Sequence, residues 1–573
     1  MISSTIYERL ADVVDVHGWR DGVAIVLNEL SSDDKEALFW EINLGAQAAW
    51  MLWVGRTPQD HVLNLDDGIG TTTVALSFLF PKVTGVFHDE SSRRCAIARA
   101  RQDGRNIDTV SIHQVKDSLS FQEGQFDLIC FSNLYAWVEG HGTSLLKGKE
   151  FLFKLLDLLT PRGMIYLGGR ENPFFQKLWL GSQGLSHHWL LSLLEEKLFR
   201  VVTKLNIYPS YGPIETVTEE RGLITYGQRY RATLRKIVKG ESSGLLLGKS
   251  RPFITSGVIR NIEQHHETVQ TDRSDIRVYV GTANTLVGKL PGGIVRVPLG
   301  REPLSRCRNN FETLHALRAI SPVAIPVPCH SGQFGDLVYF EETKLPGDEP
   351  IGQWKWDGKS DMITAQAFRY LLQLHAITSQ KVILGEGLYE SLVGLPFKSL
   401  YGYCQRTDKD LFANVEILLK ERLLGKEAVL VRTHGDFKRT NLLVNETGKV
   451  IGLIDWDLSR TMGFPFIDLL WYLSYEIHLK RRIPFYQAIV RVAFEDDLFL
   501  NERVQSYWQE LGIGPPERQK IYAAILLLYQ IHEHLDHWHK AEQDWFSHTM
   551  VPILRFAFEN ALGAAVEHSR SAL

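Results

Sequence analysis

The chain has 573 residues, which is more than one hydrophobic core usually organises, so two or more domains are expected. Hydrophobic residues make up 44% and charged residues 23%, a composition typical of folded soluble proteins. The formal net charge of −4 gives no electrostatic reason to expect a nucleic-acid partner.

The cysteines and the N-terminal residues argue against further classes of protein. Five cysteines are scattered without a C-x-x-C pair, which argues against a disulfide framework and against a zinc knuckle. The first residues, MISSTIYERLADVVDVHGW, carry early acids and no long apolar core, so they do not resemble a secretory signal. No apolar run reaches the roughly 18 residues that would span a bilayer. We therefore expect a cytoplasmic protein without a transmembrane segment, of unspecified oligomeric state.

In chain order, residues 1–54 are typical of amphipathic, tryptophan-rich helices. Residues 55–215 then alternate short apolar runs with helical patterns. HVLNL, KVTGVF, FDLICFSNL and MIYLGG are typical of strands, and segments such as SSRRCAIARARQDG are typical of helices. This alternation predicts βαβ units and an α/β, doubly wound, mostly parallel sheet.

The second half has a different pattern. Residues 216–250 end in KGESSGLLLGKSRP, whose glycine, serine and lysine content predicts a linker. Within 251–350, RVYVGTANTLVGKLPGGIVRVPLG predicts three short antiparallel strands joined by glycine turns, followed by the helix NNFETLHALRAI and the strand DLVYFEE. Residues 351–573 have mostly helical periodicity. This half is therefore α+β, with a β-rich part and a larger helical part.

Two segments of the second half carry oxygen ligands and acids in an order that suits phosphoryl transfer. THGDFKRTNLL places Asp436 five residues before Asn441, and GLIDWD ends an apolar run on Asp455. Phosphoryl transfer needs a carboxylate at the acceptor hydroxyl, oxygen ligands for Mg²⁺ and a cation near the phosphates. LLVNETGKVIGLI is typical of a hairpin, which would return Asp455 to the side of Asn441.

These residues resemble the aminoglycoside phosphotransferase and choline kinase-like enzymes, which are relatives of the protein kinases. HGDFKRTNLL resembles their catalytic loop and GLIDWD their metal-binding segment. GFPFIDLLWYL, YLLQLHAI, FEETKLPGD and GTANTLVGKL resemble further elements of the same family. The resemblance covers roughly residues 250–573. It implies a bilobal protein-kinase-like fold and an ATP-dependent phosphotransferase that uses Mg²⁺.

The resemblance also implies roles for single residues of the two segments. Asp436 would accept the proton of the acceptor hydroxyl, and Lys438 would face the transferred phosphate. Asn441 and Asp455 would hold Mg²⁺, and Asp457 would assist a second ion.

Residues upstream and beside these segments receive roles from the same resemblance. On the nucleotide side, Arg296 would contact the phosphates and pair with Glu312. Gly281 and Asn284 would belong to the loop that covers the phosphates, and Glu341 to the hinge strand.

Two neighbours of the predicted site are expected to be structural. His434 would brace the catalytic loop, and Asp468 would cap the helix that begins in GFPFIDLLWYL.

Residues 55–215 resemble class I methyltransferases that use S-adenosylmethionine, with the closest likeness to those found among bacterial surface-glycan genes. VLNLDDGIG stands where such enzymes have a glycine-rich turn, which leaves Gly68 and Gly70 as the cofactor-facing glycines. Phe87 occupies the place of the acid that binds the ribose, and Asp89 is the nearest substitute. Two alternatives stay open: a domain that binds S-adenosylmethionine, or a degenerate scaffold.

The sequence as a whole thus predicts a fusion of a methyltransferase-like domain with a kinase-like domain. The expected activity is Mg·ATP-dependent phosphorylation of a hydroxyl on a small molecule or a glycan, in surface polysaccharide modification. One alternative is a non-catalytic ligand-sensing or scaffold protein. Another is an aminoglycoside-type antibiotic kinase, for which the acids of FEDD (494–497) could bind a cationic acceptor. The sequence does not specify the acceptor, nor ATP against GTP.

Overall fold

The computed structural model of the chain describes most of its predicted elements and groups them into two compact units. The first comprises Met1–Ser305 with His330–Glu341, and the second Arg306–Cys329 with Glu342–Leu573. The described residues are 4–31, 34, 38, 41–42, 61–66, 68–111, 121–131, 154–169, 200–207, 213–217, 242–248, 277–280, 284–290, 292–334, 336–350, 358–400, 406–481, 483–495, 502–512, 516–538 and 550–562.

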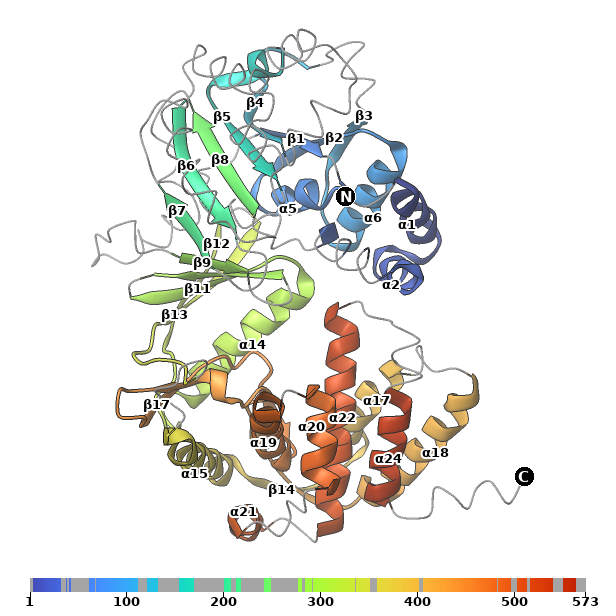
Figure 1. The fold of residues 1–573 in the computed structure, drawn as a ribbon, viewed down its shortest axis with the longest axis vertical. Helices are drawn as coiled ribbons and strands as arrows, with labels where there is room; N and C mark the ends of the chain where they lie inside the picture. Colours follow the sequence, from blue (N-terminus) through green and yellow to red (C-terminus); the bar gives the residue numbers. More distant parts are fainter. Residues whose placement is uncertain are drawn as a thin grey trace. The chain divides into compact units, whose positions relative to one another are not determined.

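The first unit contains a parallel α/β arrangement, as predicted for residues 55–215. The parallel strands follow the order β3-β2-β1-β4-β5, so the order reverses between β1 and β4 (Figure 1). Its elements up to there are α1 (Ser4–His17), α2 (Trp19–Glu29), β1 (His61–Asp66), α5 (Thr71–Leu79), β2 (Lys82–Phe87), α6 (Glu90–Gln102), β3 (Asp108–Ser111), β4 (Phe126–Phe131) and β5 (Leu159–Gly169).

The same sheet continues through strands from both sides of the predicted linker. Beyond β5 its order is β8-β6-β7-β9-β10-β11-β13-β12, and β8 lies inside the segment 216–250. The linker prediction therefore overlooked a strand that pairs with β5 and β6. These strands are β6 (Arg200–Ile207), β7 (Pro213–Val217), β8 (Ser242–Gly248), β9 (Arg277–Val280), β10 (Thr285–Lys289), β11 (Gly293–Pro298), β12 (Pro328–Phe334) and β13 (Leu337–Thr343).

One hydrophobic core of the first unit joins the α/β region to the antiparallel strands. It includes Val62 and Leu76 of the former and Leu286, Val297 and Tyr339 of the latter. The strands predicted for a separate lobe therefore share a core with the α/β region.

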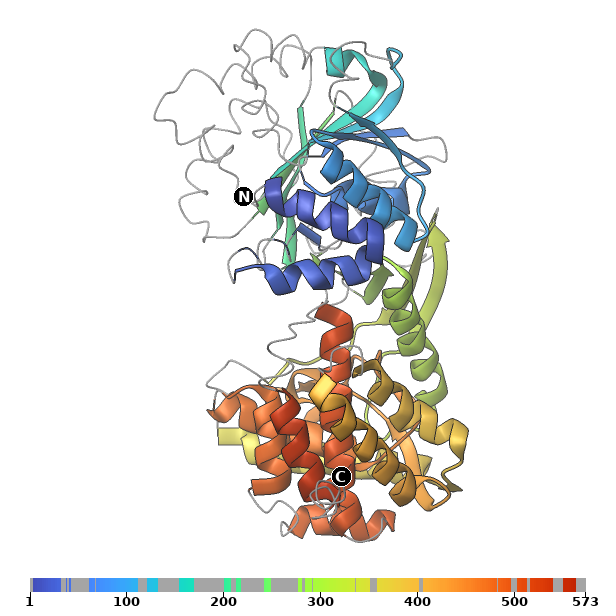
Figure 2. The same cartoon turned by 90° about the vertical axis from the view of Figure 1, so that its right-hand side faces the viewer.

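The N-terminal helices pack on the outside of the α/β region. In Figure 2 the two dark blue helices α1 and α2 lie beside α6. Arg94 of α6 pairs with Asp12 and Asp15 of α1 at 3.0 and 2.5 Å.

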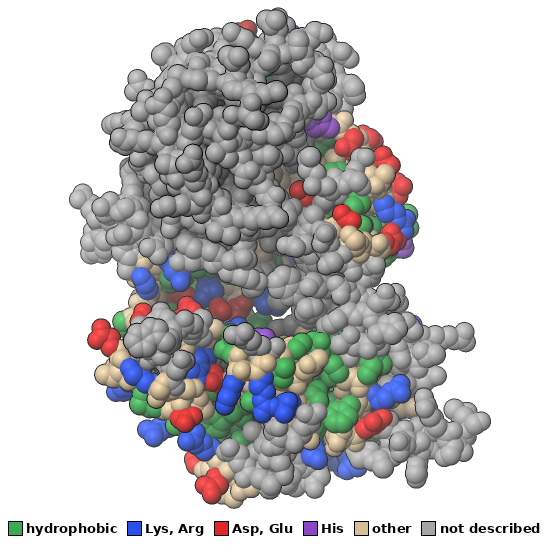
Figure 3. All heavy atoms as spheres, in the orientation of Figure 1, with side chains coloured by type: hydrophobic (Ala, Val, Ile, Leu, Met, Phe, Trp, Pro, Cys, Tyr) green, Lys and Arg blue, Asp and Glu red, His purple; other side chains and the backbone are tan. Residues whose placement is uncertain are grey.

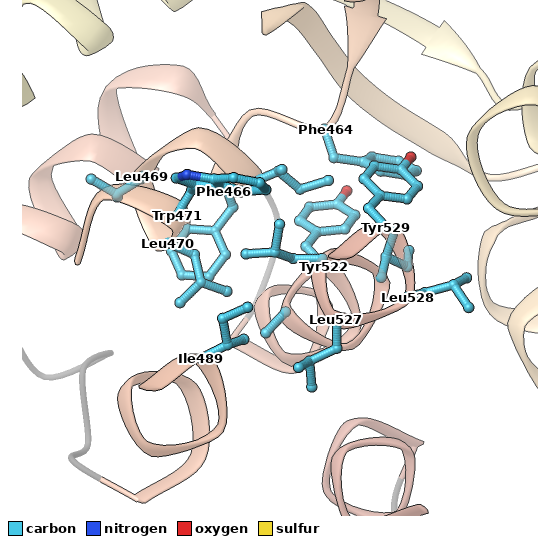
Figure 4. Packing of buried hydrophobic residues seen from close by; sticks show 14 of the residues in the cluster. Phe464, Phe466, Leu469, Leu470, Trp471, Ile489, Tyr522, Leu527, Leu528 and Tyr529 are labelled. Carbon is cyan, nitrogen blue, oxygen red and sulfur yellow. The ribbon is translucent and has the colours of Figure 1, made fainter. Parts of the chain in front are cut away.

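The second unit is mainly helical, with two small sheets, β14-β15-β18 and β16-β17. Phe464 stacks on Tyr522 with ring centroids 4.6 Å apart, inside a core that also holds Trp471 and Ile489 (Figure 4). Its elements are the larger part of α14 (Arg301–Leu317), α15 (Ser360–Thr378), β14 (Gln380–Ile383), α16 (Glu386–Tyr389), a π-turn (Glu390–Gly394), α17 (Leu395–Leu400), α18 (Arg406–Leu423), β15 (Glu427–Thr433), a 3₁₀ turn (Arg439–Asn441), β16 (Leu442–Val444), β17 (Val450–Leu453), β18 (Arg460–Gly463), α19 (Phe466–Arg481), α20 (Phe485–Val490), a second π-turn (Arg491–Glu495), α21 (Glu502–Leu511), α22 (Pro516–Trp538) and α24 (Val551–Leu562).

The predicted hairpin between the two motifs is confirmed. β16 pairs antiparallel with β17, and Asn445 Oδ1 accepts hydrogen bonds from the backbone N–H groups of Thr447 and Lys449 in the turn. The hairpin brings the segment after β17 back to the loop before β16.

The described surface carries both signs of charge (Figure 3), and the described helices are short or polar relative to a membrane span. On the face drawn in Figure 3, described acidic and basic side chains are interspersed. None of the described helices is long and apolar enough to cross a membrane.

Candidate active site

The loop after β15 places Asp436 at its centre. Gly435 has φ +84°, and a Cβ there would overlap the backbone carbonyl of Leu458, so this position requires glycine. Asn441 closes the loop, since its Nδ2 donates to the backbone oxygen of Asp436 at 2.8 Å and to Asp436 Oδ2 at 3.1 Å. The five-residue spacing in the sequence is thus the span of one closed turn.

The two carboxylate oxygens of Asp436 have different surroundings. Lys438 Nζ lies 2.6 Å from Asp436 Oδ2, whereas the buried Oδ1 has no hydrogen-bond partner among the described residues. A buried acceptor without a partner is costly, and in a native structure it calls for a ligand or a catalytic role. Asp436 Oδ1 therefore has room in its hydrogen-bonding capacity for a further donor, as the predicted role of Asp436 requires.

Charges around Asp436 act in opposite directions on its protonation. Burial raises the pKa of Asp436 above its ordinary value, Lys438 opposes this rise, and the neighbouring Asp455 adds to it. For Lys438, burial alone would lower the pKa, but Asp436 and Asp455 outweigh it and the pKa is raised. Lys438 therefore stays charged and helps to keep Asp436 ionised.

Lys438→Met should shift the pH dependence of transfer. In its predicted role Asp436 must be ionised to accept a proton, so the rate of the predicted phosphoryl transfer should fall as pH drops through the pKa of Asp436. Removing the cation that opposes the raised pKa raises it further, and the acid limb of kcat/KM should move to higher pH. Lys438→Arg, which keeps the charge, should leave the limb near its wild-type position. A pH–rate profile measures this, and an unmoved limb in Lys438→Met would contradict the assigned role.

The segment after β17 brings Asp455 beside the loop. Ile454 N donates to the backbone oxygen of Asn441 at 3.0 Å, and Asp455 follows with φ +69°, a value that residues other than glycine rarely adopt. Trp456 is fully buried, with its ring centroid 4.4 Å from that of His434. Asp455 is close enough to shift the pKa of both Asp436 and Lys438.

The predicted metal ligands differ in how well they converge. Asn441 donates through Nδ2 to Asp436, and its Oδ1 accepts a long hydrogen bond of 3.4 Å from Thr440 Oγ1. This amide oxygen and the Asp455 carboxylate are donors that suit Mg²⁺. Asp457 instead faces Arg306, at 3.8 Å. No cluster of three or more His, Cys, Asp or Glu in the described part of the chain could hold a metal.

Asp468 and His434 hold the backbone of the loop that carries Asp436. Asp468 is fully buried and accepts hydrogen bonds from the backbone N–H groups of His434, at 2.7 Å, and Gly435, at 2.8 Å. It was expected to cap its own helix, but these loop donors take both of its oxygens. His434 accepts from Asp436 N and donates through Nε2 to the Ile454 oxygen, which fits the lowering of its pKa by burial.

Two further residues, His375 and Tyr507, support this loop through Asp468 and were not predicted from the sequence. His375 of α15 contacts Asp468 Oδ2 through Nε2 at 3.2 Å and Tyr507 through Nδ1 at 2.6 Å. Tyr507 donates to the Pro465 oxygen at 2.7 Å, so His375 links Asp468 through Tyr507 to the backbone just before α19. His375 is the histidine of the YLLQLHAI motif, and this motif is the sequence feature that could have pointed to it.

Residues predicted for the nucleotide lie on elements of both units. Arg296 is on β11 and Asn284, with φ +56°, precedes β10 in the first unit. Glu341 is buried on β13 of the same unit. Glu312 is an exposed residue of α14 in the second unit, and Gly281 lies outside the described residues. Their convergence on one nucleotide, and the pairing of Arg296 with Glu312, stay predictions.

In the α/β region, two of the predicted cofactor residues have structural roles. Asp89 caps α6, because its carboxylate accepts from Ser92 N at 2.7 Å. Gly70 has φ +81° at the start of α5, and a Cβ there would lie 2.9 Å from Ala96 Cα and 3.2 Å from the Phe87 ring. Gly68 is buried just before it. Helix packing therefore accounts for the glycine at position 70.

Gly70→Ala should destabilise the first unit more than a left-handed glycine alone explains. The matched control is Gly124→Ala, where φ is +67° and a Cβ meets no described atom within 4 Å. Both changes share a backbone strain of about 1–2 kcal/mol, and the overlap with Ala96 should add about 1–3 kcal/mol. Urea unfolding of the two variants measures the difference, and equal losses would contradict the packing role.

Comparisons with known proteins give one family match, in the C-terminal region. Residues 268–505 match the model of the phosphotransferase enzyme family. A search of curated proteins gives no match.

Solved structures of aminoglycoside phosphotransferases are similar at low identity. The streptomycin–ATP complex of APH(2")-IIa is 15% identical, covering 53% of this chain and 98% of that one, with a TM-score of 0.35. ADP-bound APH(2'')-Ib is 13% identical, covering 50% and 98%, with a TM-score of 0.34.

Proposed function

We propose, from the phosphotransferase-family domain at residues 268–505, that this protein transfers a phosphoryl group from Mg·ATP to a hydroxyl of a small molecule or glycan. The observation that supports this most is the buried Oδ1 of Asp436, which has no described partner while Lys438 occupies Oδ2. A buried acid with an unpartnered oxygen and a raised pKa is typical of catalytic groups.

The reaction assigns each group a step. The acceptor hydroxyl donates its hydrogen bond to Asp436 Oδ1, and its oxygen attacks the γ-phosphorus of the nucleotide. A bond from phosphorus to the acceptor oxygen forms as the bond from phosphorus to the β,γ-bridging oxygen breaks. The proton passes to Asp436, and ADP leaves. Lys438 holds Asp436 in place and contributes positive charge beside the transferred group.

Asn441 Oδ1 and Asp455 would hold the metal, and Asp457 would assist a second ion. Bound Mg²⁺ would neutralise charge on the nucleotide phosphates. Arg296 with Glu312, Gly281 and Asn284, and Glu341 would contact the nucleotide, as proposed from the family resemblance.

Calorimetric titration of the full chain with Mg·ADP and Mg·GDP tests the nucleotide site. Binding near micromolar strength, about −8 kcal/mol, with loss of binding when Mg²⁺ is omitted, is the expected result. A coupled ADP-release assay with neutral sugars, acidic sugars and kanamycin then tests the acceptor. Turnover of kanamycin would favour an antibiotic kinase over a glycan kinase. A folded protein that binds neither nucleotide would favour the non-catalytic alternative.

For the α/β region we propose a methyltransferase-like scaffold that no longer binds S-adenosylmethionine. The reversal of strand order between β1 and β4 is where such folds bind ligands. However, Asp89 is engaged as a helix cap and Phe87 is buried against Gly70. Titration with S-adenosylmethionine should give no heat up to millimolar ligand. Micromolar binding would instead restore the bifunctional alternative, in which both transfers modify a surface glycan.

A further inference from the structure

Two adjacent asparagines lie in the middle of α14 and point polar groups at the metal-binding segment. Asparagine is unfavourable inside a helix because its side chain competes for backbone hydrogen bonds. Asn310 is nonetheless buried, with 1% of its surface exposed. Such a residue at a buried helix position suggests a specific partner.

Asn310 uses both ends of its amide. Its Nδ2 donates to Glu342 Oε2 at 2.6 Å, and its Oδ1 accepts from the backbone N–H of Trp456 at 2.9 Å. Glu342 lies on β13 next to Glu341, the residue proposed to contact the nucleotide. Trp456 directly follows Asp455, the proposed metal ligand. Within the second unit, the side chain of Asn310 therefore connects Glu342 to the backbone that follows Asp455.

The contact with Trp456 fixes the peptide on one side of a strained residue. Asp455 has φ +69°, and the peptide before it is held through the Ile454 oxygen, which accepts a hydrogen bond from His434 Nε2 at 3.0 Å. The peptide after it is held by Asn310. Because Trp456 is fully buried, water does not readily replace this acceptor. The direction of the Asp455 carboxylate thus depends on Asn310.

Asn309 secures the next residues of the same segment. Its Nδ2 donates to the backbone oxygens of Asp457 and Ser459, both at 2.8 Å. Ser459 in turn donates through Oγ to the Thr433 oxygen at 2.7 Å, at the start of the catalytic loop. Hydrogen bonds thus hold this segment to α14 on one side and to the loop on the other. The contact of Asn310 with Trp456 therefore lies in a segment whose position is defined.

We propose that Asn310 is a positioning residue that aims Asp455 at the bound metal and ties this aim to Glu342. The inference rests on the proposed function, because it assumes that Asp455 binds the divalent ion of a nucleotide complex. It makes metal affinity depend on a helix residue that contacts neither the metal nor the nucleotide.

The test measures Mn²⁺ binding by the full chain with ADP, through the electron paramagnetic resonance signal of free Mn²⁺. Asn310→Leu removes both hydrogen bonds and should weaken Mn²⁺ binding about tenfold, as for one lost hydrogen bond. Asn310→Asp places a carboxylate against Glu342 and should weaken it as well. The double variant N310D/E342Q restores a donor to this pair and should return the affinity to within about twofold of wild type.

Arg308→Ala, an exposed position of the same helix, is the control and should bind Mn²⁺ as wild type does. Hydrogen exchange of the Trp456 amide should be faster in Asn310→Leu, a readout independent of the metal. Wild-type Mn²⁺ affinity in folded Asn310→Leu and Asn310→Asp would overturn the inference. If Asn310→Leu fails to fold, the Asp variant and its rescue decide. Absence of Mn·ADP binding in the wild type would instead overturn the proposed function, and this inference with it.

Discussion

Asp436→Asn should abolish phosphoryl transfer while leaving nucleotide binding nearly intact. The amide has almost the same shape, so the loop contacts from Asn441 and the backbone can persist. It cannot take up a proton, whichever way it is turned. Loss of a general base typically costs about 10²–10⁴-fold in kcat. The affinity for Mg·ADP should change by no more than about threefold, since the proposed ligands Asn441 and Asp455 remain.

The measurement pairs a single-turnover assay with calorimetry on the same preparation. Glu446→Gln is the matched control, because it removes one carboxylate from an exposed turn of the neighbouring hairpin. It should leave both quantities unchanged. Turnover of Asp436→Asn at the wild-type rate would remove the assignment of Asp436 as the base and with it the main support for the mechanism.

The parts of the site that the sequence predicted are those that depend on local geometry. The spacing of Asp436 and Asn441 is one closed turn, and the hairpin between the two motifs follows from Asn445 and Gly448 in its turn. Both are determined within a few residues of chain. The return of the segment before Asp455 to Asn441 could therefore be predicted without knowing the rest of the fold.

The supporting contacts could not be predicted in this way, because their partners are distant in the chain. His375 and Asp468 are 93 positions apart, and Asn310 and Trp456 are 146 apart. Asp468 stands in the first turn of α19, where a helix-capping role is the local expectation, but buried N–H donors of the loop compete for the same oxygens. The sequence features that could have pointed to these contacts are the histidine of YLLQLHAI and the two adjacent asparagines inside a predicted helix.

In the α/β region, the local sequence pattern around Asp89 already predicts the role that the structure shows. The predicted cofactor role came instead from the resemblance to methyltransferases. Asp89 and Ser92 form a D-x-x-S pattern at a helix start, which predicts a cap. The ribose-binding role rested on the methyltransferase resemblance alone. The position of β8 inside a glycine- and serine-rich segment was missed for a related reason, since composition says little about strand pairing with β5 and β6.

Asp468→Asn should damage both stability and catalysis, although Asp468 contacts no proposed substrate. Each carboxylate oxygen of Asp468 accepts from a backbone N–H of the loop, and one also contacts His375. An asparagine must turn its NH₂ toward at least one of these donors, which leaves a buried N–H unpaired next to a second donor. Breaking such a buried charged network typically costs about 3–5 kcal/mol.

Two measurements separate this effect from a general loss of folding. Hydrogen exchange at the amides of His434 and Gly435 should accelerate even where the rest of the second unit stays protected. The rate of transfer should fall about a hundredfold, as for a loop displaced by about 1 Å, with little change in Mg·ADP affinity. Asp361→Asn, an exposed acid in the first turn of α15, should alter neither. Unchanged exchange in Asp468→Asn would mean that Asp468 does not hold the loop. The position of Asp436 would then depend on its other contacts, such as those with Asn441 and Lys438.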